Sequence, residues 1–364
     1  MGGERDPAAE RVDVDGFTLL SKLRDGPMGK VYEAEQRSLS RRVALKILSS
    51  DGLQKRPWVQ ALRREGELLA RFSHPNIVTV FERGTWEGRP YFVMEYLEGE
   101  TLADRLAGGP MSPVALAALS LPILSAVAAC HERGIVHGDL KPENVFLASI
   151  DTGIVPKLID FGIAFDAGIA KGPEVSAGTP EYMAPEVLRG EPAGAGSDQY
   201  AMGVVLYEMA TGHLPRLHED DPERLRLIAK HGLVPPRHHV PNLDETLEEV
   251  IERALHPERS ARFRDMREMM RALLPVAGPR ERAEYKAQLD AADRNDDDDG
   301  LDSEESGSIP TLDARMVDGA LDSIRPSAAK PPAPATAQTG FSWAVPLALV
   351  IGVAVGFGLG VLLS

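Results

Sequence analysis

The segment IVHGDLKPENVFL, residues 135–147, places an aspartate, a lysine and an asparagine within six consecutive positions. A carboxylate such as Asp139, held beside a hydroxyl group, can orient that hydroxyl and accept its proton. Lys141 adds a positive charge close by, and Asn144 adds an amide oxygen that can bind Mg²⁺. The segment therefore predicts a loop that activates a hydroxyl group next to a negatively charged reactant.

A second acidic position follows the strand-like segment PKLIDFGIAF, residues 156–165. Mg²⁺ is usually held by one or two protein oxygens, while waters and substrate phosphates complete its octahedron. Asn144 and Asp160 are therefore candidate ligands of one Mg²⁺ ion, which leaves Asp139 free to handle the proton. Phosphoryl transfer needs these parts together with a phosphate cradle and a cation on the phosphates. Both of the missing parts are expected nearer the N-terminus.

The segment LRDGPMGKVY, residues 23–32, supplies a candidate phosphate cradle. Gly26 and Gly29 allow a tight strand-to-strand turn whose backbone can approach phosphates without interference from a Cβ atom. A Walker A loop is excluded, because Val31 stands where that motif requires Ser or Thr and the upstream glycine is too close. Taken alone, the segment fits an ordinary hairpin turn equally well.

The candidate cation is Lys46, at the end of the apolar strand segment VALK. Nineteen residues later Glu65 falls in a helical stretch, where it shares a stripe with Trp58, Leu62 and Leu69. A carboxylate on an apolar face needs a cation, so we expect an ion pair between Glu65 and Lys46. The alternative is a helix turned so that Glu65 faces water.

Two regions of different secondary structure are predicted. Residues 17–97 contain mainly short strands, with one helical stretch near 57–72. Residues 98–274 contain long helical segments such as 113–133 and the apolar stretch 197–212, which ends in a glycine. The fold class is therefore α+β, with a small β-rich lobe and a larger α-rich lobe. The clearest strand-like runs are KVYEAEQ, RRVALKIL, NIVTVFERG and PYFVMEY.

In their order and spacing, these motifs resemble the protein kinase family, specifically the Hanks-type (eukaryotic-like) serine/threonine kinases of bacteria. The resemblance covers roughly residues 17–274 and implies a two-lobed protein kinase fold that uses ATP with Mg²⁺ or Mn²⁺. It implies that Asp139 is the catalytic base with Lys141 as its companion, and that Lys46 pairs with Glu65. The residues implied to bind the nucleotide are Leu23, Gly26, Gly29, Val31, Ala44, Lys46, Glu95, Leu97, Asn144 and Asp160, of which Asn144 and Asp160 are also the implied metal ligands.

The resemblance extends to the C-terminal lobe. The segment GTPEYMAPE, residues 178–186, resembles the substrate-docking loop of the family, which implies that Glu186 pairs with Arg262. Asp198, at the start of the apolar helix, is implied to anchor the backbone of the catalytic loop.

The substrate and the hinge are implied in the same way. Lys141 and Thr179 together resemble the serine/threonine subclass rather than the tyrosine subclass, so Ser and Thr side chains of proteins are the implied acceptors. Met94 is the implied gatekeeper, before a hinge at residues 95–97.

The chain departs from the family pattern at two positions. Arg24 stands where the glycine-rich loop has its first glycine, and Pro27 stiffens the tip, which predicts an altered nucleotide affinity. Gly138 replaces an arginine that, in many members, is neutralised by a phosphorylated activation loop. The only hydroxyl in residues 163–178 belongs to Ser176. These features predict that activation-loop phosphorylation contributes weakly to activity.

Two other functions fit parts of the pattern. The first is a weakly active or inactive kinase-like scaffold that recruits partners to a membrane. It is disfavoured because Lys46, Glu65, Asp139, Asn144 and Asp160 are all present. The second is a kinase of small molecules such as aminoglycosides, which is disfavoured because GTPEYMAPE resembles a peptide-docking platform.

The composition, with 43% hydrophobic and 26% charged residues, suits a folded domain of this size. The formal net charge is −15, and residues 281–325 carry fourteen Asp and Glu against five Lys and Arg. The folded part is therefore only mildly acidic and lacks the basic balance of a nucleic-acid-binding protein. The single cysteine, Cys130, lies in an apolar stretch and cannot form an internal disulfide, which indicates a reducing compartment.

Residues 275–340 are rich in Pro, Asp, Ser and Ala and predict a disordered linker. Within them, the spacing from Asn295 to Gly300 resembles an EF-hand loop. Ser306 stands at the closing position, however, and no flanking helices are expected. A calcium loop is therefore disfavoured against a solvated acidic segment.

Residues 341–363 contain no charged residue and, at about 1.5 Å per residue, are long enough to cross a bilayer as one helix. Gly352, Gly356 and Gly360 recur on one face, which predicts a homodimer through close helix contact. The alternative is the general tolerance of membrane helices for glycine.

The predicted orientation places the kinase domain in the cytoplasm. Arg325 and Lys330 precede the membrane segment, in agreement with the excess of positive charge on cytoplasmic sides of membrane helices. The N-terminal tail, residues 1–16, is polar at its start and carries no signal peptide. The sequence therefore predicts a single-pass membrane protein with a cytoplasmic serine/threonine kinase domain.

Overall fold

The computed structural model of the 364-residue chain describes residues 12–26, 29–49, 73–160, 165–166, 179–215 and 232–301. Glu65, Ser176 and the predicted membrane helix at 341–363 lie outside the described residues, as do Pro27 and the Phe-Gly pair after Asp160.

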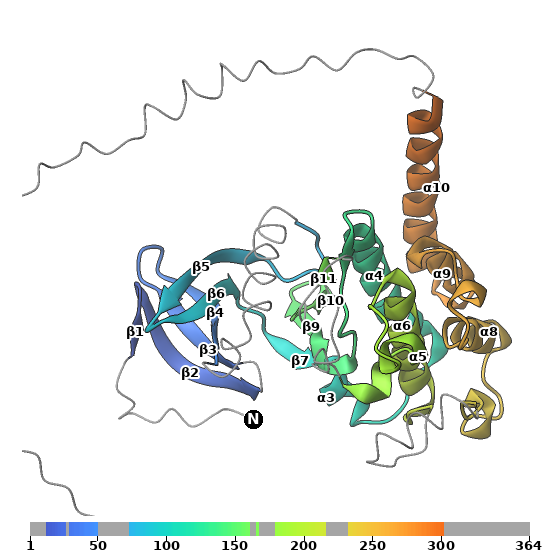
Figure 1. Cartoon of the computed structure of the whole chain (residues 1–364), viewed down its shortest axis with the longest axis horizontal. Coiled ribbons are helices and arrows are strands. Elements are labelled where there is room, and N and C mark those ends of the chain that lie inside the picture. The colour runs from blue at the N-terminus through green and yellow to red at the C-terminus, as the bar shows by residue number, and fades with distance from the viewer. Residues whose placement is uncertain are drawn as a thin grey trace, which may run out of the picture. The chain divides into compact units, whose positions relative to one another are not determined.

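The small lobe is built on an antiparallel six-stranded sheet with the order β1-β2-β3-β4-β6-β5 (Figure 1). Its centre is apolar, because Val43 and Leu45 on one strand and Val93 on its neighbour have no exposed surface. Phe17 packs edge-on against Tyr91 on the same side, with ring centroids 6.3 Å apart. The strands are β1 (Asp13–Val14), β2 (Phe17–Gly26), β3 (Gly29–Gln36), β4 (Arg41–Leu48), β5 (Val80–Trp86) and β6 (Arg89–Glu95).

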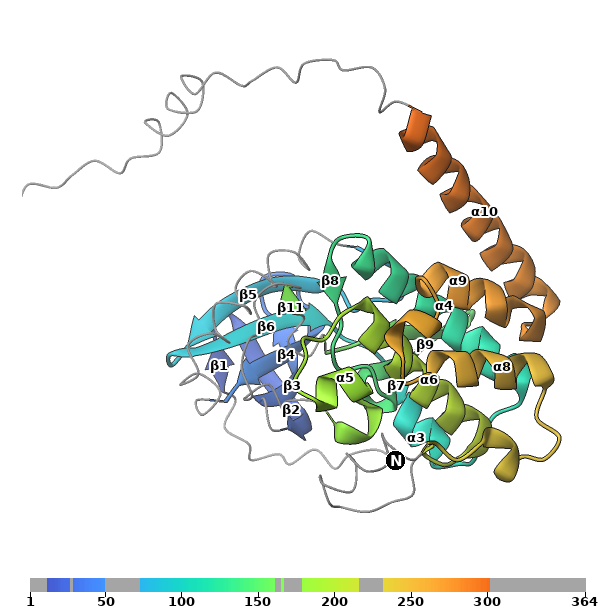
Figure 2. The same cartoon turned by 45° about the vertical axis from the view of Figure 1, so that its right-hand side comes forward.

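The large lobe is mainly helical (Figures 1 and 2). Its α-helices are α3 (Leu102–Leu106), α4 (Pro113–His131), α5 (Pro185–Leu188), α6 (Ala195–Thr211), α8 (Glu245–Ala254), α9 (Met266–Leu273) and α10 (Pro279–Leu301). Its 3₁₀ helices are η1 (Pro142–Asn144), η2 (Pro180–Tyr182), η3 (Pro236–His238), η4 (Arg259–Ala261) and η5 (Leu274–Val276).

Local signals explain where the two long core helices begin and end. The Ser112 side chain caps α4 by accepting a hydrogen bond from the Ala115 N–H, and Pro113 occupies the first helical position. Helix α6 ends at Gly212, whose φ of +74° is the left-handed conformation of a helix C-terminus. The sequence predicted this end correctly.

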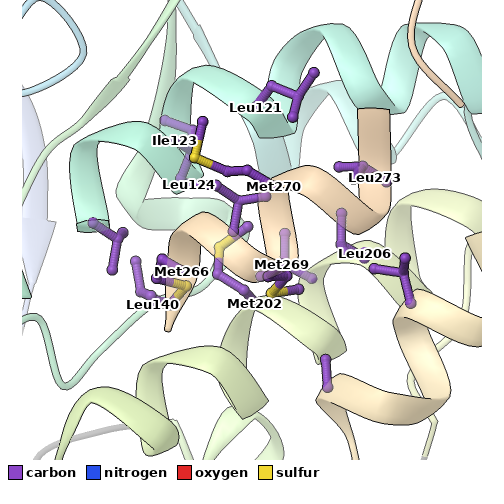
Figure 3. Close-up of a cluster of buried hydrophobic side chains, with 14 of the residues drawn as sticks. Leu121, Ile123, Leu124, Leu140, Met202, Leu206, Met266, Met269, Met270 and Leu273 are labelled. Carbon is purple, nitrogen blue, oxygen red and sulfur yellow. The ribbon is translucent and has the colours of Figure 1, made fainter. Parts of the chain in front are cut away.

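The core of the large lobe lies where α4, α6 and α9 meet (Figure 3). Leu121 and Leu124 of α4, Met202 of α6, and Met270 and Leu273 of α9 each have at most 1% of their surface exposed. Burying one such side chain contributes about 1.5–3 kcal/mol. The catalytic loop is therefore supported by a rigid, closely packed platform.

Helix α4 is, among the described residues, the one helix long and apolar enough to cross a bilayer. Most of it is buried inside the large lobe, where it contacts α6, α9 and the sheet strand β10 (Gly153–Leu158). Its apolar surface therefore belongs to the core of the lobe.

Short strands connect the core to the site. Strand β9 (Val145–Ile150) pairs with β10 and with β7 (Gly99–Thr101), and β8 (Ile135–Val136) pairs with β11 (Phe165–Asp166). These pairings hold both ends of the catalytic loop. Strand β10 also bonds to the segment before β5: the Leu158 N–H donates to the Asn76 carbonyl at 2.8 Å, and the Val78 N–H donates to the Leu158 carbonyl at 2.9 Å.

Helix α10 corrects the prediction of a disordered linker over 275–340, which is wrong for residues 279–301. Tyr285 and Leu289, four residues apart, are 8% and 3% exposed and join the core cluster of the large lobe. Arg282 donates to the carbonyls of Pro275 and Ala277, and Gln288 donates to Ser125 Oγ at 2.7 Å. The first half of the helix is thus docked, and this docking offsets the weak helix propensity of the Asp-rich half.

Candidate active site

The catalytic loop lies between β8 and β9 and contains η1. The Lys141 ammonium lies 3.0 Å from a carboxylate oxygen of Asp139 and donates to Thr179 Oγ1 at 2.8 Å. The Asn144 amide donates to the Asp139 carboxylate at 2.9 Å and to the Asp139 backbone carbonyl at 2.8 Å. Lys141 and Asn144 therefore both meet the Asp139 carboxylate, and Lys141 links this group to Thr179.

Asp198 anchors the backbone of this loop, as the resemblance implied. Its carboxylate is 1% exposed and accepts hydrogen bonds from the N–H groups of His137 at 2.8 Å and Gly138 at 2.9 Å. His131 Nε2 lies 2.8 Å from the same carboxylate and donates to it, since a carboxylate can only accept. Burial by itself would raise the pKa of Asp198, but the His131 and Gly138 hydrogen bonds hold it below its usual value.

Gly138 lies in the left-handed region, with a φ of +74°. A residue with a Cβ atom is strained there by about 1 kcal/mol or more, whereas glycine is not. The N–H of Gly138 is held by Asp198 and the next residue is Asp139, so this backbone conformation helps to set the direction of the catalytic carboxylate.

Lys46 and Asp160 form a short ion pair across the two lobes, with 15% and 29% of their side chains exposed. Burial would raise the pKa of Asp160, but the charge and hydrogen bond of Lys46 lower it, with further help from Arg24 and His137. Asp160 has a φ of +53°, which is strained for a residue other than glycine. Such strain in a non-glycine residue is typical of functional sites.

The Asn144 and Asp160 side chains suit a hard divalent cation. The Asn144 nitrogen is bound to Asp139, so its oxygen is the atom left to act as a ligand. Asp160 supplies a carboxylate that is paired with Lys46. Among the described residues no cluster of three or more His, Cys, Asp or Glu side chains could hold a metal.

The glycine turn and β4 form the small-lobe side of the site. Gly26 pairs with Gly29 at the turn, and Val31 pairs with Lys46 on the adjacent strand. Leu23, on β2 before the turn, is 46% exposed. Gly29 is required for a second reason, because a Cβ atom there would lie 2.2 Å from the Ile47 carbonyl of β4.

The hinge is fixed by side chains as well as by the backbone. The Glu95 carboxylate accepts hydrogen bonds from Lys157 Nζ and from the Thr79 N–H, both at 2.7 Å. The Glu95 N–H donates to the Thr79 carbonyl at 2.9 Å. Met94 pairs with Ala44 on β4, and Leu97 follows the end of β6. The predicted gatekeeper and hinge residues therefore lie beside the predicted nucleotide site.

The docking loop is held by a buried ion pair. Arg262 donates from both terminal nitrogens to the Glu186 carboxylate, at 2.7 and 2.8 Å, and Ser197 Oγ donates to it at 3.1 Å. Burial would raise the pKa of Glu186, but the Arg262 hydrogen bond and charge hold it below its usual value. A small pocket next to Asp139 is lined by residues of this loop, including Thr179 and Met183.

Among the predicted site residues, the structure joins Lys141 and Asn144 to Asp139, and it joins Lys46 to Asp160. The Ile159 N–H, next to Asp160, donates to the Asn144 carbonyl at 2.9 Å. The remaining predicted residues lie on or beside strands of the small-lobe sheet: Leu23, Gly26, Gly29, Val31, Ala44, Glu95 and Leu97. The predicted partner Glu65 lies outside the described residues. Sequence reasoning missed three contributors: His131, which binds Asp198, Lys157, which binds the hinge, and Arg24, which donates to Glu143. Of the three, only Lys157 carried a usable sequence signal, because it is a lone lysine in the apolar strand segment PKLID.

Comparison with known proteins agrees with this geometry. The model of the protein kinase domain family matches residues 17–273. The chain belongs to the protein kinase family. Members of this family use ATP and a divalent metal ion, which fits the lysine, amide and carboxylate groups described above.

Bacterial serine/threonine-protein kinases are among the similar proteins. Pkn1 of Myxococcus xanthus is 37% identical over 266 residues, 71% of this chain and 38% of its own length. The kinase pkn2 of the same organism is 37% identical over 235 residues, 63% of this chain and 28% of its own length. PknL of Mycobacterium tuberculosis is 37% identical over 216 residues, 58% of this chain and 53% of its own length. The chain therefore spans between about a quarter and a half of the length of these curated relatives.

A solved structure shows the same two-lobed fold. The crystal structure of the Mycobacterium tuberculosis PknI kinase domain is 27% identical, with a TM-score of 0.58, and the match covers 74% of this chain and 99% of that chain. The predicted fold class, α+β with the two-lobed protein kinase architecture, is confirmed for the kinase domain.

Proposed function

We propose that this chain transfers the γ-phosphoryl group of ATP to Ser and Thr hydroxyls of proteins. The observation that carries the proposal is that Lys141 and Asn144 both contact the Asp139 carboxylate, while Lys141 also binds Thr179. The Lys46–Asp160 pair lies next in the chain to Ile159, whose N–H donates to the Asn144 carbonyl at 2.9 Å. These groups are the base, the cation and the metal ligands that phosphoryl transfer requires.

The metal proposed is Mg²⁺, with Mn²⁺ as a substitute. Asn144 and Asp160 would hold it through one amide and one carboxylate oxygen. When bound, the ion neutralises negative charge on the phosphates. Lys46 supplies positive charge on the nucleotide side, and its present pairing with Asp160 keeps both groups ordered.

Asp139 would orient the acceptor hydroxyl and accept its proton. Asn144 and Lys141 donate toward the Asp139 carboxylate from two sides, so the carboxylate has a fixed direction. Lys141 also lies against Thr179 Oγ1, which ties the base to the docking loop. We infer that this link aligns the acceptor peptide with the base, and that Ser and Thr are preferred.

We further propose that residues 341–363 anchor the chain in a membrane as a single helix, with the kinase domain in the cytoplasm. The support is the length and the uncharged composition of this segment. Expression of the full chain and of a chain without residues 341–363, followed by separation of membrane and soluble fractions, tests the anchor. Recovery of the full chain in the soluble fraction would contradict it.

The kinase function is tested with the purified full chain in detergent, labelled ATP and Mg²⁺, followed by mapping of the modified side chains. The wild type should label Ser and Thr. Asp139→Asn should lower turnover by roughly 10²–10⁴-fold while nucleotide still binds, because only the proton acceptor is lost. Absence of labelling by the wild type would sink the proposal.

Expression of Asp160→Asn in cells distinguishes the kinase function from the scaffold alternative. This change removes a metal-binding charge but keeps the size of the side chain. A kinase should lose its cellular function with this variant, whereas a scaffold should keep it.

A further inference from the structure

We propose that Arg24 is a positioning residue that latches the small lobe to the catalytic loop over the nucleotide site. The inference rests on the proposed kinase function, and it concerns the residue that replaces the first glycine of the glycine-rich loop. The Arg24 latch is defined here as the hydrogen bond from Arg24 Nη1 to the Glu143 carbonyl, at 3.3 Å.

The local geometry of β2 aims the side chain of Arg24 toward the large lobe. The pairing of β2 with β3 shifts register twice, first between Leu19 and Ser21 and again between Lys22, opposite Tyr32, and Arg24, opposite Val31. The second shift lies directly before Arg24. One extra residue, Leu23, is therefore accommodated in β2. Such a bulge bends the strand and redirects the side chains beside it. The result is a contact between residues 119 positions apart, made from the strand that leads into the glycine turn.

The partner of Arg24 belongs to the catalytic machinery. Glu143 lies in η1, between Lys141 and the proposed metal ligand Asn144. The acceptor is a backbone carbonyl, so its position is set by the loop and not by a flexible side chain. The latch therefore joins the backbone of the catalytic loop to the glycine-rich turn, which are the two elements that would enclose a nucleotide.

The electrostatic surroundings favour a cation at this place. The positive charge of Arg24 helps to lower the pKa of Asp104, at the start of α3. An acidic group of the large lobe thus lies near Arg24 and attracts the guanidinium toward the closed position. A glycine at position 24 would provide neither the hydrogen bond nor this attraction.

The latch is expected to act on lobe closure. A nucleotide held between β2 and the catalytic loop binds the closed arrangement, so its apparent affinity falls with the closed fraction of the free protein. Loss of the latch would reduce that fraction before any ligand is present. The affinities for adenosine, ADP and ATP should then all fall by the same factor. A direct contact with phosphate would instead weaken ATP more than adenosine.

The test compares Arg24→Ala, Arg24→Gly and Arg24→Lys in the full chain. The matched control is Arg37→Ala, since Arg37 is also an exposed arginine of the small lobe but pairs with Asp13. Dissociation constants for adenosine, Mg-ADP and Mg-ATP are measured by calorimetry, together with kcat and KM for ATP. Amide hydrogen exchange of residues 17–36 is followed in the nucleotide-free protein.

Removal of the side chain should weaken all three ligands by a common factor of roughly three- to tenfold, the size expected for one exposed hydrogen bond from a charged donor. KM for ATP should rise by a similar factor while kcat changes less than twofold, and exchange at the β2–β3 end should become faster. Arg24→Lys should give intermediate values, because an ammonium can also donate to the carbonyl.

Two results would overturn the latch. One is that Arg24→Ala and Arg24→Gly bind adenosine, Mg-ADP and Mg-ATP as tightly as the wild type does. The other is a loss that grows from adenosine to ATP, which would assign Arg24 to phosphate binding. If the wild type binds no nucleotide, the proposed kinase function fails instead, and the hydrogen-exchange comparison alone decides whether the latch exists.

Discussion

At the scale of single residues, position 138 shows how a departure from the family pattern acts. The backbone there has a φ of +74° and is held by Asp198, directly before the catalytic carboxylate. An arginine in this conformation would be strained, whereas glycine reaches it without cost. The glycine therefore removes both a charge and a strain from the catalytic loop. We expect the loop to hold this conformation without a phosphorylated residue to neutralise it.

The first prediction concerns this glycine. Gly138→Ala should lower the free energy of unfolding by about 1 kcal/mol and should also lower kcat, because the backbone before Asp139 shifts. Gly134→Ala is the matched control, since Gly134 has a φ of +72° and open space around it. It should cost the same stability and leave kcat unchanged. Equal turnover in all three proteins would contradict the positioning role of residue 138.

The second prediction concerns the activation segment. If the catalytic loop needs no external phosphate, Ser176→Ala should change kcat less than about threefold, because position 138 carries no charge for a phosphate to neutralise. Turnover is measured after phosphatase treatment of both proteins. A hundredfold loss in the variant would refute the expectation.

Most of the catalytic residues were predictable from the sequence, because each lies in a short local motif with a chemical reason for its residue type. Asp139, Lys141 and Asn144 are of this kind. The Arg24 and Lys157 contacts were not predictable, because the partner of Arg24 is 119 residues away and that of Lys157 is 62 residues away. Such contacts depend on a strand bulge and on the arrangement of the lobes.

At the scale of elements, the Glu186–Arg262 pair joins α5 to the loop after η4. Arg262 has no exposed side-chain surface, and Glu186 has 6%. Removing one partner leaves a buried charge without compensation, which costs far more than a surface pair contributes. The docking loop therefore depends on a group that is distant in the chain from the catalytic residues.

The third prediction follows from this pair. Arg262→Ala should destabilise the domain by about 3–5 kcal/mol in urea unfolding. The depressed pKa of Glu186 means that its contribution is complete above the usual value of 4.5 and is lost as the pH falls through the lower folded value. Wild type should therefore lose stability more steeply than Glu186→Gln between about pH 5 and pH 3. If the stability of both proteins fell equally with pH, the stabilising role of the Glu186 charge would be contradicted.

The fourth prediction concerns α10. Leu289→Ala should lower the free energy of unfolding by about 2–3 kcal/mol, because the side chain is 3% exposed and its removal leaves a cavity. Lys286→Ala, on the exposed face of the same helix, should change it by less than about 0.5 kcal/mol. Equal stability of both variants would show that the helix is not docked.

The elements of the sheet and the core helices were predictable, since strand alternation, capping residues and Gly212 are local signals. The runs KVYEAEQ, RRVALKIL and PYFVMEY are confirmed as β3, β4 and β6. Helix α10 was missed because its Asp-rich composition is typical of disorder. What stabilises it is the contact of Tyr285 and Leu289 with a distant helix, and composition does not report such contacts.

At the scale of the whole molecule, the chain combines a kinase domain with a strongly acidic segment and an uncharged C-terminal stretch. The acidic segment begins on α10, whose first half packs against the domain. Its charge would keep neighbouring copies apart by repulsion, so any self-association should depend on the C-terminal stretch.

The fifth prediction tests that dependence. Gly356→Ile should reduce self-association of the full chain in bilayers by roughly tenfold, because a branched side chain prevents close approach of two helices. Gly358→Ile is the control, since in the predicted helix a residue two positions from Gly356 would face away from Gly352, Gly356 and Gly360. Energy transfer between labelled copies measures the change. The same loss in both variants would contradict a specific helix face.

The docking of Tyr285 and Leu289 has a practical consequence for recombinant work. A truncation at residue 275, which the family match at 17–273 would suggest, strips away α10 and leaves apolar atoms of α4 in water. Such a fragment should be prone to precipitate, and its poor yield would be mistaken for an intrinsically inactive enzyme. A soluble preparation should end after Leu301, the last residue of α10.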